Sequence, residues 1–514
     1  MIEAQVHQHL RAFLRECHEP TWPHHLTMAR LVARALRLGR SALLQVGGLS
    51  AYQGQYRFSY LIALLMWPGP AILVVPDEIR QTILLQDLPR LQDSLSLHKP
   101  IQIGNRWPHP DFAGLLMTTP EAWFNDRLGQ GDAFPEGLPT VIDDADNLDQ
   151  WVRDSLTAEI SAPAWEALTL AFPGCQEIIR DTRVALTHSA FQHPVNPYHC
   201  HLLTQAERER LQQLQDSLGQ ATLQAGPSTL PMPLPWQRFW QGLGSPDFLL
   251  WYTIDREQGQ IKLHCSPIDV APVLTPIWQR QPVVLIGAAL DPDAKADIFR
   301  QSYGLSDLTC LKFAPHRQHN AIRLYLPDHL PLPNTPQFQA ELLLETRRLL
   351  TFVKPSVKGP TVILVDDLPL KQQLAANLAA EFGSRVQVDQ PLQHPDAILV
   401  SGWKFWHHHR PSWPSPGLLI IATLPLPSLE NPLVAGRVAY HKRKRQDWFR
   451  LYLFPVAVSE LQRAVAPLRA NQGMVALLDT RVHYRSYGRQ VLEALSPSAC
   501  SRKLQTDWQF DLDG

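Results

Sequence analysis

Lysine is scarce in this chain, and its distribution excludes one common kind of nucleotide site. The 514 residues include only eleven lysines, and none of them lies in residues 1–98. The dipeptide Gly-Lys does not occur anywhere. A phosphate-binding loop of the GxxxxGK[ST] type needs that lysine to reach the β- and γ-phosphates. A standard loop of this type is therefore excluded.

Charge excess, paired cysteines and long apolar runs are absent as well. With 47 Lys+Arg against 48 Asp+Glu, any nucleic-acid-binding surface must be a local patch. The six cysteines form no CxxC pair, which is typical of a reducing compartment. The longest apolar stretch, residues 60–75, is interrupted at 68–70 and is too short to span a bilayer. Because the N-terminus also lacks the apolar core of a signal peptide, we expect a cytoplasmic protein.

Short apolar runs alternate with helix-like segments over much of the chain, which predicts an α/β fold with parallel sheets. The length suits two or more domains. The runs lie at 41–46, 71–75, 140–142 and 282–287, and again at 361–365, 397–400, 418–421 and 475–478. We predict a first domain from 1–150 and 250–330, a mostly helical insertion at 151–249, a second domain at 331–498 and a loose polar tail at 499–514.

Three carboxylates follow one of these runs within four positions. Asp143, Asp144 and Asp146 come directly after the apolar residues 140–142. A buried parallel strand delivers such side chains to its C-terminal edge, where α/β proteins bind ligands. They could hold Mg²⁺ and orient water. An Asx turn that caps the following helix explains the same residues equally well.

The order of these segments resembles the DinG/XPD branch of superfamily 2 DNA helicases. The resemblance covers roughly residues 20–495 and is weakest in the insertion. It implies two RecA-like domains of the P-loop NTPase type, with a cleft for ATP and Mg²⁺ between them. It also implies a nucleic-acid track across the top and an arch-like insertion. The segments that carry it are 84–91, 141–148 at the family's DEAH box, 266–270, 299–305, 424–433 and 473–481.

The resemblance also assigns the first two nucleotide motifs, and both depart from the family pattern. The phosphate-binding loop should fall in residues 47–59, where Gly54, Gln55 and Arg57 take the cofactor-binding positions. Asp143 matches the carboxylate that binds Mg²⁺, whereas Asp144 replaces the glutamate that polarises water and is shorter by one methylene. A misplacement of about 1 Å can reduce a rate roughly a hundredfold.

The later motifs depart from the pattern together. Motif III lacks its hydroxyl residues at 286–290, and motif V reads Phe-Trp-His-His-His-Arg at 405–410. In motif VI, Gln462 and Arg469 match the family, but Ala466 stands where the first arginine belongs. We expect Arg463 not to replace that arginine, because it lies on another face of the helix. Residues 60–142 contain no cysteine, so we expect no iron–sulfur cluster.

One basic run is a candidate for binding nucleic acid. It lies close to Trp448 and Phe449, and single strands are held by such combinations of charge and aromatic rings. A solvated helix face is about equally compatible with the run. The histidines at 407–409 and the cluster at 188–201 fit no standard metal spacing. The predicted nucleic-acid-binding residues are Lys442, Arg443, Lys444, Arg445 and, in motif V, Trp406.

The favoured hypothesis is a helicase-related protein that binds nucleic acid, as single-stranded DNA or a junction, with ATP hydrolysis weakened or lost. One alternative is an active ATP-dependent DNA helicase with atypical motifs. Another is a scaffold for protein partners on a helicase fold. In an active motor, Asp143 would hold Mg²⁺, Asp144 would orient water, and Arg469, beside Gln462, would contact phosphate.

Overall fold

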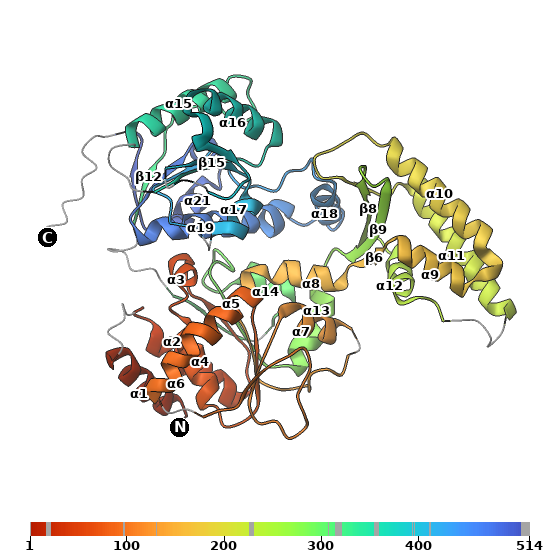
Figure 1. Ribbon diagram of the computed structural model, residues 1–514, viewed down its shortest axis with the longest axis horizontal. Coiled ribbons are helices and arrows are strands. Elements are labelled where there is room, and N and C mark those ends of the chain that lie inside the picture. Colours follow the sequence, from red (N-terminus) through yellow and green to blue (C-terminus); the bar gives the residue numbers. More distant parts are fainter. Residues whose placement is uncertain are drawn as a thin grey trace.

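The computed structural model describes residues 2–16, 22–95, 98–129, 131–225, 231–306, 308–313, 321–353, 359–392, 394, 396–410 and 413–504. Their helices and strands form two α/β domains and a third unit that is inserted into the first (Figure 1). Domain 2 lies over domain 1, and the insertion extends to one side of both. Within these residues, none of the helices combines the length and apolar composition that a bilayer crossing requires.

Domain 1 is built on a seven-stranded sheet in the order β11-β1-β10-β5-β2-β4-β3, and all its pairings are parallel. Its inner strands are buried on both faces, which is why they are continuous apolar runs in the sequence. The strands are β1 (Ala42–Gln45), β2 (Ala71–Val74), β3 (Ile101–Ile103), β4 (Leu115–Thr118), β5 (Thr140–Ile142), β10 (Val283–Gly287) and β11 (Thr309–Lys312).

Helices cover both faces of this sheet and enclose two apolar clusters. One cluster contains side chains of α1 (Ile2–Glu16), α2 (His25–Leu38), α4 (Arg57–Met66) and α6 (Leu88–Leu95). The opposite cluster contains side chains of α7 (Pro120–Leu128), α8 (Leu148–Leu156), α13 (Ala271–Arg280) and α14 (Asp297–Tyr303). The carboxyl ends of the strands face domain 2, so the residues after β1, β5 and β10 lie at the boundary between the domains.

Domain 2 repeats this design with the order β14-β15-β13-β16-β17-β12-β18, again parallel throughout. The prediction of two RecA-like domains is therefore confirmed. The strands are β12 (Ile322–Tyr325), β13 (Thr361–Leu364), β14 (Val386–Val388), β15 (Ile398–Ser401), β16 (Leu418–Ile421), β17 (Met474–Leu477) and β18 (Ser498–Ser501). The covering helices are α15 (Phe338–Val353) and α16 (Leu368–Phe382) on one face and α17 (Trp403–His409), α19 (Phe454–Ala470) and α21 (Gly488–Ala494) on the other.

Two predicted boundaries of domain 2 are corrected. Strand β12 belongs to its sheet, so the domain begins before residue 322 rather than at 331. Residues 499–501 are part of β18, which pairs with β12, and are not a loose tail. Residues 505–514 lie outside the described part of the chain. The short polar sequence of β18 gives no apolar run by which a strand could be predicted.

The insertion contains a sheet that the sequence did not predict. Its helices are α9 (Ala162–Ala171), α10 (Gln176–Gln192), α11 (Gln205–Ala225) and α12 (Leu234–Leu243). Its strands, in the antiparallel order β6-β9-β8-β7, are β6 (Ala158–Ile160), β7 (Cys200–Leu202), β8 (Phe248–Asp255) and β9 (Gln260–Pro267). The hairpin β8–β9 lies beyond residue 249, so the insertion ends near Pro267.

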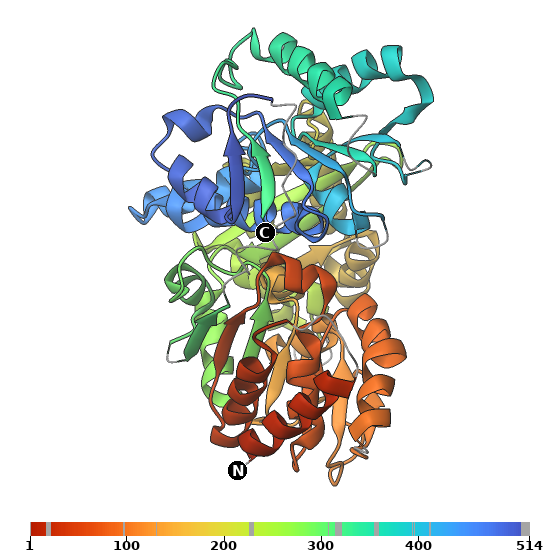
Figure 2. The same cartoon turned by 90° about the vertical axis from the view of Figure 1, so that its left-hand side faces the viewer.

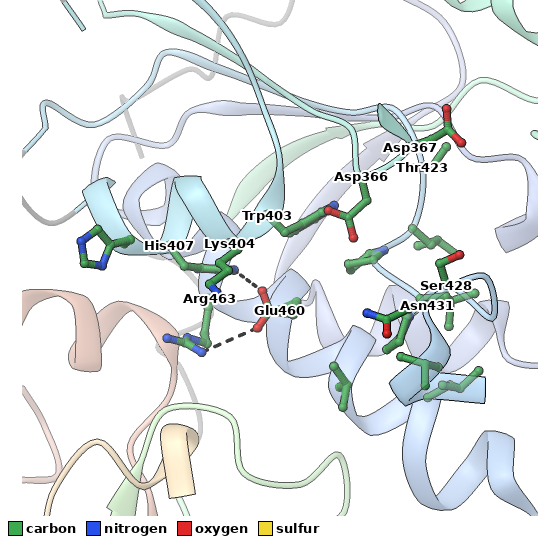
Figure 3. A pocket seen from close by; sticks show the side chains of 18 of the residues that line it. Asp366, Asp367, Trp403, Lys404, His407, Thr423, Ser428, Asn431, Glu460 and Arg463 are labelled. Atoms are coloured by element: carbon green, nitrogen blue, oxygen red, sulfur yellow. Dashed lines mark ion pairs between the residues drawn. The ribbon is translucent and has the colours of Figure 1, made fainter. Parts of the chain in front are cut away.

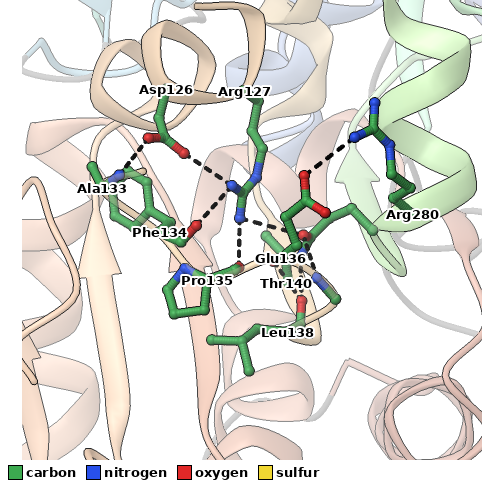
Figure 4. Close-up of polar contacts among 11 residues, drawn as sticks. Asp126, Arg127, Ala133, Phe134, Pro135, Glu136, Leu138, Thr140 and Arg280 are labelled. Carbon is green, nitrogen blue, oxygen red and sulfur yellow. Dashed lines mark hydrogen bonds and ion pairs between the residues drawn. The ribbon is translucent and has the colours of Figure 1, made fainter. Parts of the chain in front are cut away.

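A polar network fixes the loop that leads into β5 (Figure 4). The Arg127 guanidinium donates to the carbonyl oxygens of Phe134 at 2.9 Å and Pro135 at 2.7 Å. Asp126 Oδ1 accepts the Ala133 amide at 2.7 Å. At the start of the strand, Gln281 Nε2 donates to Thr140 Oγ1 at 2.7 Å. Because both ends of this loop are tied, the position at which β5 begins is well determined.

Two helices of domain 2 pack on the other units in the described part of the chain. Helix α19 packs on α3 (Gly48–Gln53), which follows β1 in domain 1. Figures 1 and 2 both show α3 at the edge of domain 1 directly below domain 2. Helix α18 (Pro432–Arg443) packs on strands β7 and β8 of the insertion. A cleft lies between these two contacts.

Candidate nucleotide cleft

The cleft has a volume of about 2170 Å³ and is lined by all three units. It includes the positions where a RecA-like fold would hold nucleotide, after β1 and β5 of domain 1 and on α17 and α19 of domain 2. Figure 3 shows the side that domain 2 contributes. The lining residues at these positions are Gly48, Tyr52, Tyr56, Arg57, Asp144, Asp146, His407, Arg410, Glu460 and Arg463.

Asp143 is sealed away from this cleft. Its side chain is 0% exposed, although β5 ends immediately before it. Oδ1 accepts the Tyr56 hydroxyl at 2.6 Å and the Asp144 amide at 2.9 Å, and Oδ2 accepts the Tyr60 hydroxyl at 2.8 Å. Burial raises the pKa of Asp143, while the two hydroxyls work to lower it. Both oxygens therefore already have partners within domain 1.

Both hydroxyls come from the residues at and just after the segment 47–59, where a phosphate-binding loop was predicted. Helix α3 is capped by Gly54, which has a left-handed φ of 69°, and α4 begins at Arg57 after Gln55 and Tyr56. Arg57 stands at a helix N-terminus, the usual place for phosphate. Its Nη1 lies 3.2 Å from Asp87 Oδ2, and both side chains are largely buried. The charge that could attract phosphate is thus neutralised within domain 1.

Asp144 and Asp146 remain at the cleft, but each is held by its surroundings. Asp144 has a φ of 61°, and its Oδ2 accepts the Asn147 side-chain amide at 2.5 Å. Burial raises the pKa of Asp144 to about 7, against the influence of Arg463. Asp146 accepts the amides of Ala288 at 2.6 Å and Ala289 at 2.7 Å. Asp146 therefore ties the loop after β5 to the loop after β10.

The wall that domain 2 contributes is an ion cluster. Glu460 Oε2 lies 2.5 Å from His407 Nε2, and Glu460 Oε1 lies 3.6 Å from Arg463 Nη1 (Figure 3). Arg410 donates to the carbonyl oxygen of Arg463. Burial works to lower the pKa of Arg463, but Glu460, Asp144 and Asp146 together raise it above its ordinary value. The two arginines thus face the carboxylates of domain 1 across the cleft.

No family model matches the chain. The ATP-dependent DNA helicase YoaA of Haemophilus influenzae is 24% identical over 279 residues, which are 51% of this chain and 43% of that protein. The 3'-5' exonuclease DinG of Bacillus subtilis is 22% identical over 297 residues, 52% of this chain and 31% of that protein. A solved XPD helicase matches with a TM-score of 0.59 at 13% identity, over 93% of this chain and 99% of that one.

The chain is thus similar in sequence to DinG- and YoaA-type helicases and shares the fold of XPD helicases. The aligned part is less than half the length of either curated relative. The solved structures, which include an Xpd4 from S. tokodaii at a TM-score of 0.55 and 14% identity, share the fold along nearly the whole chain.

The family's motif VI residues are not where the sequence placed them. Arg469 is buried and donates to the carbonyl oxygens of Leu495 at 2.8 Å and Pro497 at 3.0 Å. Gln462 donates to the Ala494 carbonyl at 3.2 Å. Both residues support the segment before β18, so the prediction that Arg469 contacts phosphate and that Gln462 is catalytic beside it is corrected.

Arg463 lines the cleft, whereas Arg469 does not. Residues 463 and 466 are three apart, so they are neighbours on the surface of α19, and the same spacing separates 466 from 469. The prediction that Arg463 lies on another face than Ala466 is therefore wrong. Arg463 could have been identified from the sequence, because it is a charged residue three positions before Ala466 in the same helix.

The predicted nucleic-acid residues divide into two groups. Trp406 is 1% exposed and packs in the apolar core of domain 2, so the prediction that it contacts nucleic acid is corrected. The residues at 442–445 are exposed at the end of α18. Lys442 Nζ lies 5.4 Å from the Trp448 ring centroid. Arg443 donates to the Pro246 carbonyl, and Lys444 lies 3.4 Å from Asp247, so part of this run contacts the insertion.

The histidine clusters do not form a metal site in the described part of the chain. Among those residues, no group of three or more histidine, cysteine, aspartate or glutamate side chains converges as it would around a metal ion. Of the 407–409 run, His407 pairs with Glu460 and His409 stacks on Phe405 with ring centroids 4.1 Å apart. Tyr56, Tyr60, Asp87 and Glu460 are site residues that were not predicted from the sequence.

Proposed function

We propose that this chain binds nucleic acid through a helicase fold that no longer hydrolyses ATP. The observation that carries the proposal is the capping of both Asp143 carboxylate oxygens by the Tyr56 and Tyr60 hydroxyls. Mg²⁺ requires near-octahedral oxygen ligands at about 2.0–2.1 Å and keeps several waters. A carboxylate that is 0% exposed and accepts three hydrogen bonds offers no position for such an ion. The residues present do not fit Mg-ATP.

The other groups that phosphoryl transfer uses are replaced as well. Residues 1–98 offer no lysine to the β- and γ-phosphates, and Arg57 is neutralised by Asp87. Asp144 is too short to take the place of glutamate, and at neutral pH it is close to half protonated, because its pKa is about 7. Ala466 replaces an arginine of a kind that can be worth roughly 10³–10⁵ in kcat. These replacements support a loss of hydrolysis and not merely a slower enzyme.

Nucleic-acid binding is supported by the exposed basic run at the end of α18. Four consecutive cationic side chains at 442–445 lie beside Trp448, and cations near aromatic rings are typical of single-strand binding. The cleft is less suitable for a phosphate backbone, since nine carboxylates and only six lysine or arginine side chains line it. We therefore assign nucleic acid to the outer surface around 442–448, with the relatives named as DNA helicases favouring DNA.

Titration calorimetry with ATP and ADP, with and without Mg²⁺, tests the first half of the proposal. We expect no binding heat in either condition. In parallel, ATP hydrolysis is measured with single-stranded DNA present, using Asp143→Asn as the matched variant. ATP hydrolysis that DNA stimulates and that Asp143→Asn abolishes would refute the loss of the motor.

Salt-dependent DNA binding tests the second half. Each phosphate contact on a single strand contributes about 0.7 to the slope of log K against log salt. Reversing all four charges at 442–445 is expected to remove roughly two to three units of slope. Arg489→Glu on α21 is the control, because this arginine side chain is 88% exposed and remote in sequence. No DNA affinity even at low salt would leave a protein scaffold as the better description.

A further inference from the structure

The segment that a motor would use to hold phosphate forms part of the contact between the two domains. A Cβ atom at Gly48, the first residue of α3, would lie 2.9 Å from the carbonyl oxygen of Gln462 and 3.4 Å from the Cβ of Ala466. A side chain at residue 48 would therefore separate α3 from α19. Ala466 is also the small residue that replaces the family's arginine. The altered loop and the altered motif VI are thus the two sides of one contact.

A second contact, between α18 of domain 2 and the insertion sheet, lies at the other end of the cleft. A Cβ atom at Gly436 in α18 would lie 2.4 Å from Leu249 Cδ1 and 3.3 Å from Leu202 Cδ1 of the insertion sheet. Tyr440, Leu249 and Ile268 form a buried apolar cluster there. Arg437 Nη1, also on α18, lies 3.7 Å from Asp149 Oδ2 of domain 1. Helix α18 therefore contacts both other units.

Charges of opposite sign face one another between the two contacts. Arg463 and Arg410 of domain 2 line the same cleft as Asp144 and Asp146 of domain 1. Burial lowers the pKa of Arg410 to about 10, whereas the carboxylates raise the pKa of Arg463 above its ordinary value despite burial. In an ATP-binding fold of this kind, triphosphate and Mg²⁺ would occupy the space between such groups. Here protein carboxylates supply the negative charge that the arginines face.

We propose that domain 2 is held closed over domain 1 by these contacts, so that closure of the cleft needs no nucleotide. Ligand-driven domain closure is common in enzymes, because the ligand supplies contacts that exist only in the closed form. In this chain the contacts at α3–α19 and α18–insertion are permanent parts of the fold, and domain 2 moves only if both break. The inference rests on the proposed loss of ATP hydrolysis, since a cycling motor requires opening.

Hydrogen exchange of the full chain tests this coupling. Helix α3 has six residues and would fray if nothing covered it, so protection of its amides reports the closed form. We expect α3 to be protected without nucleotide and unchanged when Mg-ATP is added. Gly436→Leu, which separates α18 from the insertion, is expected to accelerate exchange in α3 at least about tenfold. Gly219→Leu, in α11 with nothing within 4 Å of its Cβ, is the matched control and should change nothing.

The reciprocal variant keeps the test decisive if Gly436→Leu does not fold. Gly48→Leu is expected to accelerate exchange in α18, on the opposite side of the cleft, while the sheet of domain 2 stays protected. Unprotected α3 in the wild type, or variants whose effects remain local, would overturn the inference. Calorimetry separates the two proposals: ATP binding without a change in α3 exchange refutes only the loss of nucleotide binding. Unprotected α3 amides in a protein that does not bind ATP would refute only the permanent closure.

Discussion

The Tyr60→Phe variant is the most direct measure of how strongly Asp143 is committed to domain 1. The change removes one hydroxyl from a side chain that is 0% exposed and leaves Asp143 Oδ2 without the 2.8 Å hydrogen bond. Hydrogen bonds to charged groups contribute about 1.5–3 kcal/mol, and water cannot replace this one. We therefore expect a local loss of about 2 kcal/mol, which corresponds to a roughly thirtyfold change in an equilibrium constant.

The assay is native-state hydrogen exchange of the amides in β5 and at Asp143, whose own amide bonds to the Val74 carbonyl. The loss of stability in Tyr60→Phe should be larger above the pKa of Asp143 than below it. Burial raises that pKa above its ordinary value, and removal of a donor to the carboxylate raises it further. Stability of the variant should therefore fall more steeply than that of the wild type as pH rises through this range.

The matched test of this reasoning is a double-mutant cycle, in which Asp143→Asn should reduce the effect of Tyr60→Phe. Coupling of this kind separates a lost hydrogen bond to the carboxylate from a general loss of packing around residue 60. A loss below about 0.5 kcal/mol at neutral pH, with no coupling to Asp143, would refute the role assigned to the Tyr60 hydroxyl.

Three further variants have definite expectations. Asp144→Asn should be more stable than the wild type at pH 8 by roughly 1–3 kcal/mol. The reason is that the pKa of the Asp144 carboxyl is raised to about 7, so ionising it lowers the stability of the wild-type protein as pH rises from about 4 to 7. Equal denaturation curves of the two proteins at pH 8 would contradict this. Trp406→Ala should lower stability by about 3–5 kcal/mol, whereas Trp406→Phe should retain the DNA affinity of the wild type in a binding titration. Arg469→Ala should cost about 1–3 kcal/mol in thermal unfolding, since it leaves buried carbonyl oxygens without their donor, and a change in ligand binding without loss of stability would count against that role.

The sequence predicted the two domains well, because their strands are buried on both faces. Strands such as β2 and β16 must be apolar at every position, and such runs are visible without knowledge of their partners. The insertion sheet gives no comparable signal. Its short strand β6 pairs with β9 about a hundred residues away, and a local pattern does not contain that pairing.

The candidate site was predictable only in part, for a related reason. The position of Asp143 at the end of β5 follows from the sequence, but the partner of its carboxylate does not. Tyr60 lies in the apolar run at 60–66, where it resembles any other core residue, and only the fold brings its hydroxyl to a residue 83 positions away. The role of Arg463 likewise depends on which face of α19 meets domain 1.

Helix α3 has a consequence for how this protein could change over evolution. Its backbone approaches α19 so closely that residue 48 has no room for a side chain. Introducing a single lysine would therefore not rebuild a phosphate-binding loop, because the helix would first have to unwind and release its hold on domain 2. An arginine side chain introduced at position 466 would overlap with α3. Each change is unfavourable until the other has occurred, so a phosphate-binding loop could not be built here one substitution at a time.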